Sequence, residues 1–358
     1  RYLMTSDAAN VAGLSETHSP SIKPYSDRDE LGRLWQQPVR LFRLSNSLRQ
    51  KSGRDAVSFV VNRNINFTNN CTGTCRFCSF KQRESYFLSS EEILNRAAEA
   101  EAQGATEICL QGGLAPTMKL EDYCCMLETI HRDHPKLHLH AFSPMEVMHM
   151  SRNSGVSIRE ALQELKKSGL GSLPGTAAEI LVDRVREEIC PDKLKARQWR
   201  EIITTAHSLG IPTTSTMLFG HVESLEDRLE HLSILREIQS ETGGFTEMVL
   251  LPFIPENNAL GKSVSGADLL EKLKMHALAR VALYPHITNI QASWTKLGRD
   301  AAAAAIDWGA NDLGGTLMDE AIARNAREAP RISAQELIEL IESRGRRAVQ
   351  RTTLYQML

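Results

Sequence analysis

Three cysteines lie close together in one short segment and are the residues best suited to chemistry. Cys71, Cys75 and Cys78 form a C-x3-C-x2-C pattern within residues 70–80. Thiolates are the usual ligands of iron–sulfur clusters, so three of them can hold three corners of a [4Fe–4S] cluster. The fourth iron then has no protein ligand and is open to a small molecule. The spacing therefore predicts a cluster that takes part in chemistry rather than one that only stores electrons.

The alternatives are a zinc site and unrelated cysteines. Structural zinc takes four ligands, usually as two separated pairs. The other cysteines do not form a second C-x2-C pair, and no histidine follows at the spacing of a zinc finger. The pattern favours the cluster, and we expect the remaining cysteines to be ordinary thiols: Cys109, Cys124, Cys125 and Cys190.

The elements that must position these cysteines follow a repeated order of β-prone run, polar loop and helical stretch. Strands alternating with helices are typical of parallel strands joined by right-handed crossovers. Eight such units predict a (β/α)8 or near-complete TIM-type barrel, with a doubly wound sheet as the alternative. The candidate strands span residues 57–67, 106–110, 137–142, 169–173, 213–219, 246–253, 288–294 and 302–308. Several helices should begin with a capping box, as at Ser89/Glu92, Ser157/Glu160 and Ser333/Glu336.

The flanks of the barrel differ from it in composition. Residues 1–25 are polar and rich in Ser, which predicts a flexible lead or linker. Residues 26–55 should form an N-terminal helical extension, with one amphipathic helix from Arg28 to about Arg49. Residues 56–330 then form the barrel and residues 331–358 a C-terminal helix and tail. The basic stretch Arg344–Arg351 is expected to be a solvated part of this tail.

The gross composition limits the classes of protein. The chain has 358 residues, 42% of them hydrophobic and 24% charged, as in an ordinary globular protein. A formal net charge of −2 gives no electrostatic case for a nucleic-acid or membrane partner. No apolar run approaches the roughly 18 residues of a membrane span. Seven cysteines are too sparse for a disulfide framework, so we expect a reducing, cytoplasmic compartment.

The cysteine loop, with Phe77 beside its last cysteine, resembles the radical S-adenosylmethionine (SAM) superfamily. That resemblance implies a [4Fe–4S] cluster whose open iron chelates SAM, and cleavage of SAM to methionine and a 5′-deoxyadenosyl radical. Gln111, Gly112 and Gly113 follow the second strand, where the superfamily has the Gly-rich segment that binds the methionine amino group. All polar segments after strand ends should meet at the carboxyl face of the barrel, where active sites lie.

Segments over almost the whole chain are similar to the CofH component of FO synthase. The resemblance implies transfer of the 4-hydroxybenzyl group of L-tyrosine to 5-amino-6-(D-ribitylamino)uracil, in the route to coenzyme F420. It also implies an external one-electron reductant and a CofG-type radical SAM partner. That partner could be separate, or fused in a longer polypeptide of which this chain is the CofH-like half. The similar segments are residues 62–69, 140–146, 174–180, 220–223, 242–247, 289–294 and 309–316.

The segment Pro255–Leu260 departs from this family, which commonly has a histidine there. It is more similar to aminofutalosine synthase, a radical SAM enzyme of menaquinone biosynthesis, and this activity is the nearest alternative. A cluster protein that only transfers electrons is the alternative from another class. The other segments favour the CofH family.

Two carboxylates are candidates for binding SAM. Ser143 and Glu146 follow the third strand and could hydrogen-bond the adenosyl group, or act as a helix cap. Glu179 lies in a Gly/Ala loop, where it could bind the ribose hydroxyls of SAM or the tyrosine ammonium. Its alternative role is a helix-start glutamate that interacts with the dipole.

The later loops hold candidates for catalysis and substrate binding. His221 and Glu223 follow the fifth strand and carry titratable groups suited to proton transfer, or form a hydrogen-bonded loop pair. Asn311 and Asp312 lie in a Gly-flanked loop, where short polar side chains suit a ribityl or uracil edge, or simply a turn. Glu247, within a strand, could face the barrel interior or solvent.

Overall fold

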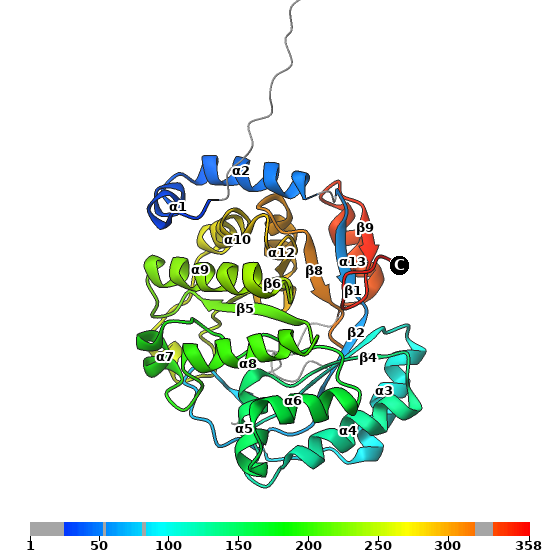
Figure 1. The fold of residues 1–358 in the computed structure, drawn as a ribbon. Helices are drawn as coiled ribbons and strands as arrows, with labels where there is room; N and C mark the ends of the chain where they lie inside the picture. Colours follow the sequence, from blue (N-terminus) through cyan, green and yellow to red (C-terminus); the bar gives the residue numbers. More distant parts are fainter. Residues whose placement is uncertain (1–24, 53–54, 81–83, 319–331) are drawn as a thin grey trace, which may run out of the picture.

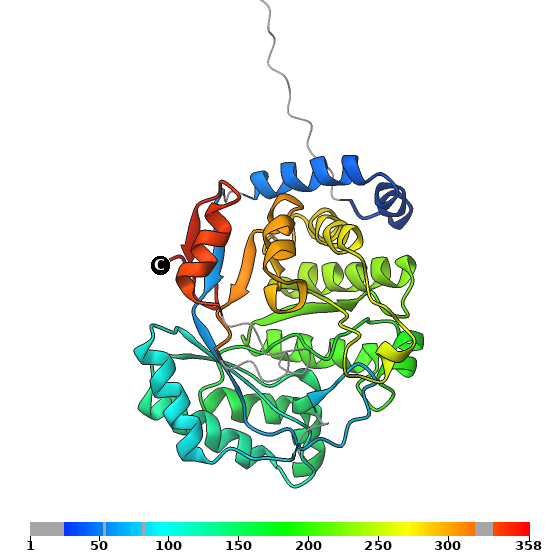
Figure 2. The same cartoon turned by 180° about the vertical axis from the view of Figure 1, so that it is seen from behind.

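Parallel strands surrounded by helices make up most of the molecule (Figures 1 and 2). The computed structural model describes residues 25–52, 55–80, 84–318 and 332–358, so nearly all of the expected lead at residues 1–25 lies outside the described residues. The strands are β1 (Val57–Val60), β2 (Asn62–Asn66), β3 (Glu107–Gln111), β4 (His138–Ala141), β5 (Thr213–Phe219), β6 (Phe245–Pro252), β7 (Ile290–Ala292), β8 (Asp312–Gly315) and β9 (Ala348–Gln350).

The strands form two parallel sheets that are joined at both edges. One sheet has the order β2-β3-β4 and the other β5-β6-β7-β8-β1-β9. Ser172 pairs with His140 of β4, and its neighbour Leu173 pairs with Thr213 of β5. On the other side β1 runs directly into β2, and Met318 after β8 pairs with Arg63. The result is the near-complete (β/α)8 barrel that the sequence predicted.

Helices cover the outside of the strands (Figure 1). After the N-terminal helices α1 (Arg28–Trp35) and α2 (Pro38–Lys51), they are α3 (Ser90–Ala102), α4 (Leu120–Asp133), α5 (Pro144–Ser154), α6 (Ile158–Lys167), α7 (Asp183–Ile189), α8 (Ala196–Ser208), α9 (Leu225–Thr242), α10 (Leu269–Leu283), α11 (Trp294–Leu297), α12 (Arg299–Asp307) and α13 (Ala334–Glu342). The three expected capping boxes are present at the starts of α3, α6 and α13. Among the described residues no helix is long and apolar enough to cross a bilayer.

Three predictions about the elements were wrong. The stretch from Ala302 to Trp308 is not a strand but mostly helix α12, because its run of alanines has the highest helix propensity. The eighth strand is β8, in the segment that we had expected to be a loop. The single helix expected from Arg28 to Arg49 is divided into α1 and α2, because the residue before Pro38 is disfavoured in a helix.

The C-terminal tail closes the amino end of the barrel. Arg351 is fully buried and donates to both oxygens of Asp312, the first residue of β8, from Nε at 2.5 Å and Nη2 at 3.0 Å. The hydroxyl of Tyr355 donates to Glu247 near the start of β6, and the hydroxyl of Thr353 to Glu107 at the start of β3. Glu247 therefore faces the barrel interior, where burial raises its pKa to about 7. The prediction of a solvated tail was wrong at Arg351.

Replacing Arg351 tests whether this closure stabilises the barrel. We expect Arg351→Met to lower the free energy of unfolding by about 3–5 kcal/mol, because it leaves the buried Asp312 without its cation. Urea unfolding followed by circular dichroism measures the change. Arg344→Met is the matched control, since Arg344 pairs with Asp307 at the surface and should contribute less than about 1 kcal/mol. Equal losses in the two variants would contradict the expectation.

Candidate active site

The loop that carries the three cysteines follows β2 and is fixed by backbone contacts to three other segments. The amide of Thr72 donates to the carbonyl of Leu114 at 3.1 Å. The amide of Arg76 donates to Ile189 at the end of α7, and the carbonyl of Arg76 accepts from Leu260, both at 2.9 Å. The loop itself is almost without regular structure, so these contacts hold it at the carboxyl end of β2.

The cysteine side chains fit an iron–sulfur cluster. Cys71, Cys75 and Cys78 are free thiols and all are partly exposed. A Cβ on Gly73 would lie 3.4 Å from Sγ of Cys71 and 3.8 Å from Sγ of Cys75, so both sulfurs lie beside this glycine. Among the described residues no three potential ligands converge on one metal ion. A [4Fe–4S] cluster does not require that convergence, because each thiolate binds a different iron.

The Gly-rich segment after β3 packs directly against the cysteine loop. A Cβ on Gly113 would lie 2.2 Å from the carbonyl oxygen of Asn70, and one on Gly112 would lie 2.4 Å from the ring of Phe67. Both positions therefore exclude any side chain. Gln111, the last residue of β3, donates from its amide to the hydroxyl of Thr176 at 2.8 Å. The structure thus brings the predicted SAM-binding segment next to the cysteines.

Glu146 connects this segment to helix α5. Ser143 and Glu146 form a capping box at the start of α5, with Oε2 of Glu146 accepting from the amide and hydroxyl of Ser143, both at 2.7 Å. Oε1 accepts from the amide of Gly112 at 3.0 Å. Burial raises the pKa of Glu146 to about 7, although these hydrogen bonds act in the opposite direction. The structure therefore shows the helix cap, which also holds the Gly-rich segment, while the contact with the adenosyl group stays a prediction.

Glu179 pairs with a lysine that the sequence analysis did not identify. Nζ of Lys193 lies 2.6 Å from Oε1 of Glu179 and 5.2 Å from the ring centre of Phe77 in the cysteine loop. Burial opposes ionisation of Glu179, but the cation of Lys193 outweighs it and lowers the pKa of Glu179. The backbone of Glu179 is left-handed, with φ of 43°, which is unusual for a residue with a side chain. Lys193 belongs to no sequence motif, so its contact with Glu179 could not be predicted before the segment after α7 was seen beside the cysteines.

His221 and Glu223 form a loop pair after β5. The carboxylate of Glu223 accepts from the amides of Gly220 and His221, at 2.6 and 2.8 Å, and from Nε of Arg228 at 2.7 Å. Nε2 of His221 donates to the carbonyl of Leu218 at 2.9 Å, which leaves Nδ1 facing Glu223 at 3.1 Å. Burial lowers the pKa of His221. Glu223 is therefore engaged in holding the loop, and Nδ1 of His221 is enclosed against its carboxylate, which favours the loop pair over proton transfer.

The structure does not bring Asn311 and Asp312 to the cysteine loop. Asn311 directly precedes β8, and its side-chain oxygen accepts from Arg280 at 2.7 Å and from the amide of Ile290 at 2.8 Å. Asp312 is held by Arg351 and by the hydroxyl of Ser58 at 2.6 Å. Both lie at the amino end of the barrel with their oxygens occupied, which favours a structural role over contact with a substrate.

The departing segment Pro255–Leu260 lies beside the cysteine loop. Leu260 donates its amide to Arg76, and Asn258 closes the segment by bonding to the carbonyls of Ile254 and Glu256. A Cβ on Gly261 would lie 1.7 Å from the carbonyl oxygen of Pro255, so this turn is tightly closed. The contacts of this segment are thus with the loop that carries the cluster ligands.

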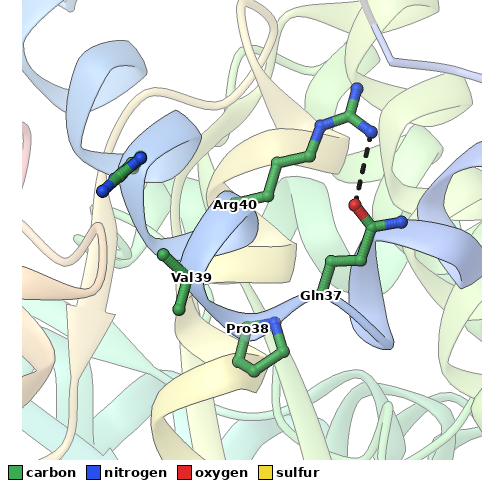
Figure 3. A pocket seen from close by; sticks show the side chains of 5 residues that line it. Gln37, Pro38, Val39 and Arg40 are labelled. Atoms are coloured by element: carbon green, nitrogen blue, oxygen red, sulfur yellow. Dashed lines mark hydrogen bonds between the residues drawn. The ribbon is translucent and has the colours of Figure 1, made fainter.

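Two surface depressions lie elsewhere. Figure 3 shows one of about 410 Å³ at the start of α2, where Arg40 reaches over Gln37, and no predicted site residue lines it. A second depression, of about 430 Å³, is lined by residues that include Trp35, Arg228 and Glu223. Neither includes a cysteine of the loop, so the predicted chemistry does not rest on them.

Comparisons with known proteins agree with this geometry. Residues 65–235 match the family described as the Radical SAM superfamily, and residues 243–358 match the CofH/MqnC C-terminal region. A relative from Archaeoglobus fulgidus named 5-amino-6-(D-ribitylamino)uracil–L-tyrosine 4-hydroxyphenyl transferase is 50% identical over 92% of this chain and 96% of its own. A relative from Methanosarcina barkeri, named as transferase 1 of the same kind, is 51% identical over 89% of this chain and 87% of its own.

The fold is shared with solved structures that are distant in sequence. Methylornithine synthase (PylB) aligns with a TM-score of 0.72 at 17% identity, over 90% of this chain and 94% of its own. The FeFe-hydrogenase maturase HydG from Carboxydothermus hydrogenoformans aligns with a TM-score of 0.70 at 16% identity, over 92% of this chain and 81% of its own. At these identities the likeness supports the barrel fold alone.

The buried Glu146 should make stability depend on pH. Its pKa is about 7 in the folded chain, against an ordinary value of 4.5. The protonated Glu146 therefore contributes its full stability to the folded chain below about pH 4.5, and this contribution is lost as the pH rises through about 7. We expect the free energy of unfolding of the wild-type chain to decrease by about 3 kcal/mol between about pH 5 and pH 8 because of this group, and Glu146→Gln to abolish that decrease. Urea unfolding without cluster or SAM measures both.

The matched control is Glu160→Gln, which changes the same capping-box position on an exposed helix. Hydrogen bonds from Ser157 lower the pKa of Glu160. The free energy of unfolding of Glu160→Gln should therefore still decrease above about pH 5, as in the wild-type chain. An unchanged pH profile for Glu146→Gln would show that burial does not hold the proton on this carboxyl.

Proposed function

The chain belongs to the family of the 5-amino-6-(D-ribitylamino)uracil–L-tyrosine 4-hydroxyphenyl transferases, and we propose that it catalyses the reaction that names the family. The 4-hydroxybenzyl group of L-tyrosine is joined to C5 of 5-amino-6-(D-ribitylamino)uracil, with release of 2-iminoacetate, methionine and 5′-deoxyadenosine. The observation that carries this proposal is 50% identity to the Archaeoglobus fulgidus relative over 92% of one chain and 96% of the other.

Membership of the radical SAM superfamily implies a [4Fe–4S] cluster and SAM. We propose that Cys71, Cys75 and Cys78, whose thiols are partly exposed, would each bind one iron of the cluster. The cluster and SAM together supply a one-electron cleavage that generates the 5′-deoxyadenosyl radical. Gln111, Gly112 and Gly113 present a segment without side chains beside the cysteines, suited to the amino group of SAM.

The remaining side chains provide charges of both signs near this segment. Glu179 is held as a carboxylate by Lys193, so it can accept hydrogen bonds from ribose hydroxyls or from an ammonium group. Lys193 lies over Phe77 and can bind a carboxylate of SAM or of tyrosine. Ser143 and Glu146 keep the Gly-rich segment in place. His221 and Glu223 form a loop pair after β5, with Nδ1 of His221 3.1 Å from the carboxylate of Glu223.

The reaction needs partners that the chain does not supply. An external one-electron reductant must reduce the cluster, and we propose that a CofG-type radical SAM activity closes the ring of the product. Aminofutalosine synthase remains the alternative activity, on the likeness of Pro255–Leu260 to that enzyme. This segment contacts the cysteine loop at Arg76, so its departure from the family lies beside the proposed cluster.

Product analysis tests the proposed reaction. We expect the reconstituted, reduced enzyme, given tyrosine and 5-amino-6-(D-ribitylamino)uracil, to release 5′-deoxyadenosine and the hydroxybenzyl adduct as separate molecules in mass spectrometry. Incorporation of the adenosyl group into the product would instead support the aminofutalosine synthase alternative. Cys78→Ser should abolish both products, whereas Cys124→Ser, on helix α4, should not.

The Glu179–Lys193 pair should contribute to binding SAM. We expect Lys193→Met to raise the Kd for SAM by about 10- to 100-fold, since a hydrogen bond to a charged group contributes about 1.5–3 kcal/mol. Equilibrium dialysis with the reconstituted enzyme measures the change. Lys195→Met is the matched control, because Lys195 lies two residues away and pairs with Glu187 at the surface. An unchanged Kd for Lys193→Met would remove this residue from the SAM site.

A further inference from the structure

The inner face of the sheet β2-β3-β4 is polar along its whole length. Alternate residues of these strands, such as Ile65, Ile108 and Leu139, belong to the hydrophobic core beneath the helices. The residues between them face the other side, and the parallel register places them in layers. From the amino end the layers are Asn62, Glu107 and His138, then Asn64, Cys109 and His140, then Asn66 and Gln111. Two histidines of one strand therefore lie on the inner face, below Gln111.

A single serine hydroxyl joins these two histidines. Oγ of Ser172 lies 2.7 Å from Nε2 of His138 and 2.7 Å from Nδ1 of His140. A hydroxyl has one hydrogen, so it donates to one ring and accepts from the N–H of the other. The three groups therefore form one hydrogen-bonded chain in which the position of each proton depends on the next.

The far end of this chain is open. Nε2 of His140 has no hydrogen-bond partner among the described residues. It also differs from Nε2 of His231 and of His276, which are fully enclosed and without a partner. His138, at the other end, is fixed by Gly171, where a Cβ would lie 2.6 Å from the ring. The open nitrogen thus belongs to the histidine that lies closer to Gln111.

Both rings are neutral at rest, and among the described residues Glu107 is the one nearby charge that favours a proton on either of them. Burial lowers the pKa of both histidines, to about 4 for His140, so both rings are neutral near pH 7. Glu107 of β3 faces them, and its pKa is lowered against the effect of burial, first by the charge of a protonated His140 and then by hydrogen bonds from Asn62 and Thr353. Cys109 of β3 and Arg351 of the tail are the other ionisable groups near the pair.

We propose that His140, Ser172 and His138 form a proton relay that deprotonates the substrate ammonium group. Nε2 of His140 accepts the proton, Nδ1–H of His140 donates to Ser172, and the Ser172 hydroxyl proton moves to Nε2 of His138. His138 becomes an imidazolium beside Glu107. No electron moves in this step, and the substrate changes from R–NH3⁺ to R–NH2.

The chemistry of the substrate supplies the reason for such a base. This inference rests on the proposed function, in which tyrosine yields 2-iminoacetate. The nitrogen carries three hydrogens in the ammonium form of tyrosine and one in the neutral imine. One of the two that leave does so as a hydrogen atom, and the other must leave as a proton. General bases contribute about 10²- to 10⁴-fold to the rate of such steps.

Substitution separates the relay from a structural role. We expect His140→Gln to lower kcat for the hydroxybenzyl adduct by about 100-fold, to leave the KM for SAM unchanged and to raise the ratio of 5′-deoxyadenosine to adduct. Ser172→Ala should reduce kcat, and Ser172→Thr should restore it. His207→Gln is the matched control, because His207 is half-buried, bonds to two threonine hydroxyls and has a pKa lowered to about 4. A wild-type ratio and kcat in His140→Gln would overturn the relay.

Spectroscopy gives a readout that does not depend on turnover. In ¹⁵N spectra of the histidine-labelled holoenzyme, we expect both His138 and His140 to carry their proton on Nδ1, and Ser172→Ala to change this pattern. A resting His140 with its proton on Nε2 would overturn the relay, since that nitrogen could then accept nothing. If the wild-type enzyme forms no adduct, the proposed function fails, and these spectra still decide the relay.

Discussion

The close approach of two backbone segments holds the first three βα loops of the site together. Gly113 lies so close to the carbonyl of Asn70 that no side chain would fit, and Gly112 lies similarly close to the ring of Phe67. This contact joins the loop after β2 to the loop after β3. Since the amide of Gly112 also binds Glu146, the start of α5 is fixed by the same contact. Three successive βα units are thereby held together at the carboxyl end of the barrel.

The buried charges are neutralised in different ways at the two ends of the barrel. At the carboxyl end, the charges of Lys193 and Glu179 neutralise each other in an ion pair beside the cysteine loop, whose thiols are partly exposed. At the amino end, Glu107, Glu247 and Asp312 face inward with Arg351 as the nearby guanidinium. Burial and the neighbouring Asp312 raise the pKa of Glu247, and the guanidinium of Arg351 lowers it only in part, because three acids share this cation. The tail therefore closes the barrel with charge as well as with packing.

The sequence predicted those parts of the fold that depend on local chemistry. The cysteine spacing, the three capping boxes and the order of most strands are local signals, and the structure has all of them. The failures concern burial by distant segments. Asp312 was expected in a loop because of its glycine neighbours, but it pairs with β1 and β7 as a strand residue, and its carboxylate binds Arg351, 39 residues later. Lys193 lacks any motif, since its role arises from a contact with Glu179 across 14 residues.

The same local motif also carries different chemistry according to its surroundings. Ser143/Glu146 and Ser157/Glu160 are both capping boxes with nearly equal hydrogen bonds. The first is buried beneath the Gly-rich segment and raises the pKa of its glutamate, whereas the second is exposed and lowers it. Sequence alone identifies both as helix starts. Because the difference is set by what covers each helix, the distinction between a cap and a site residue requires the folded barrel.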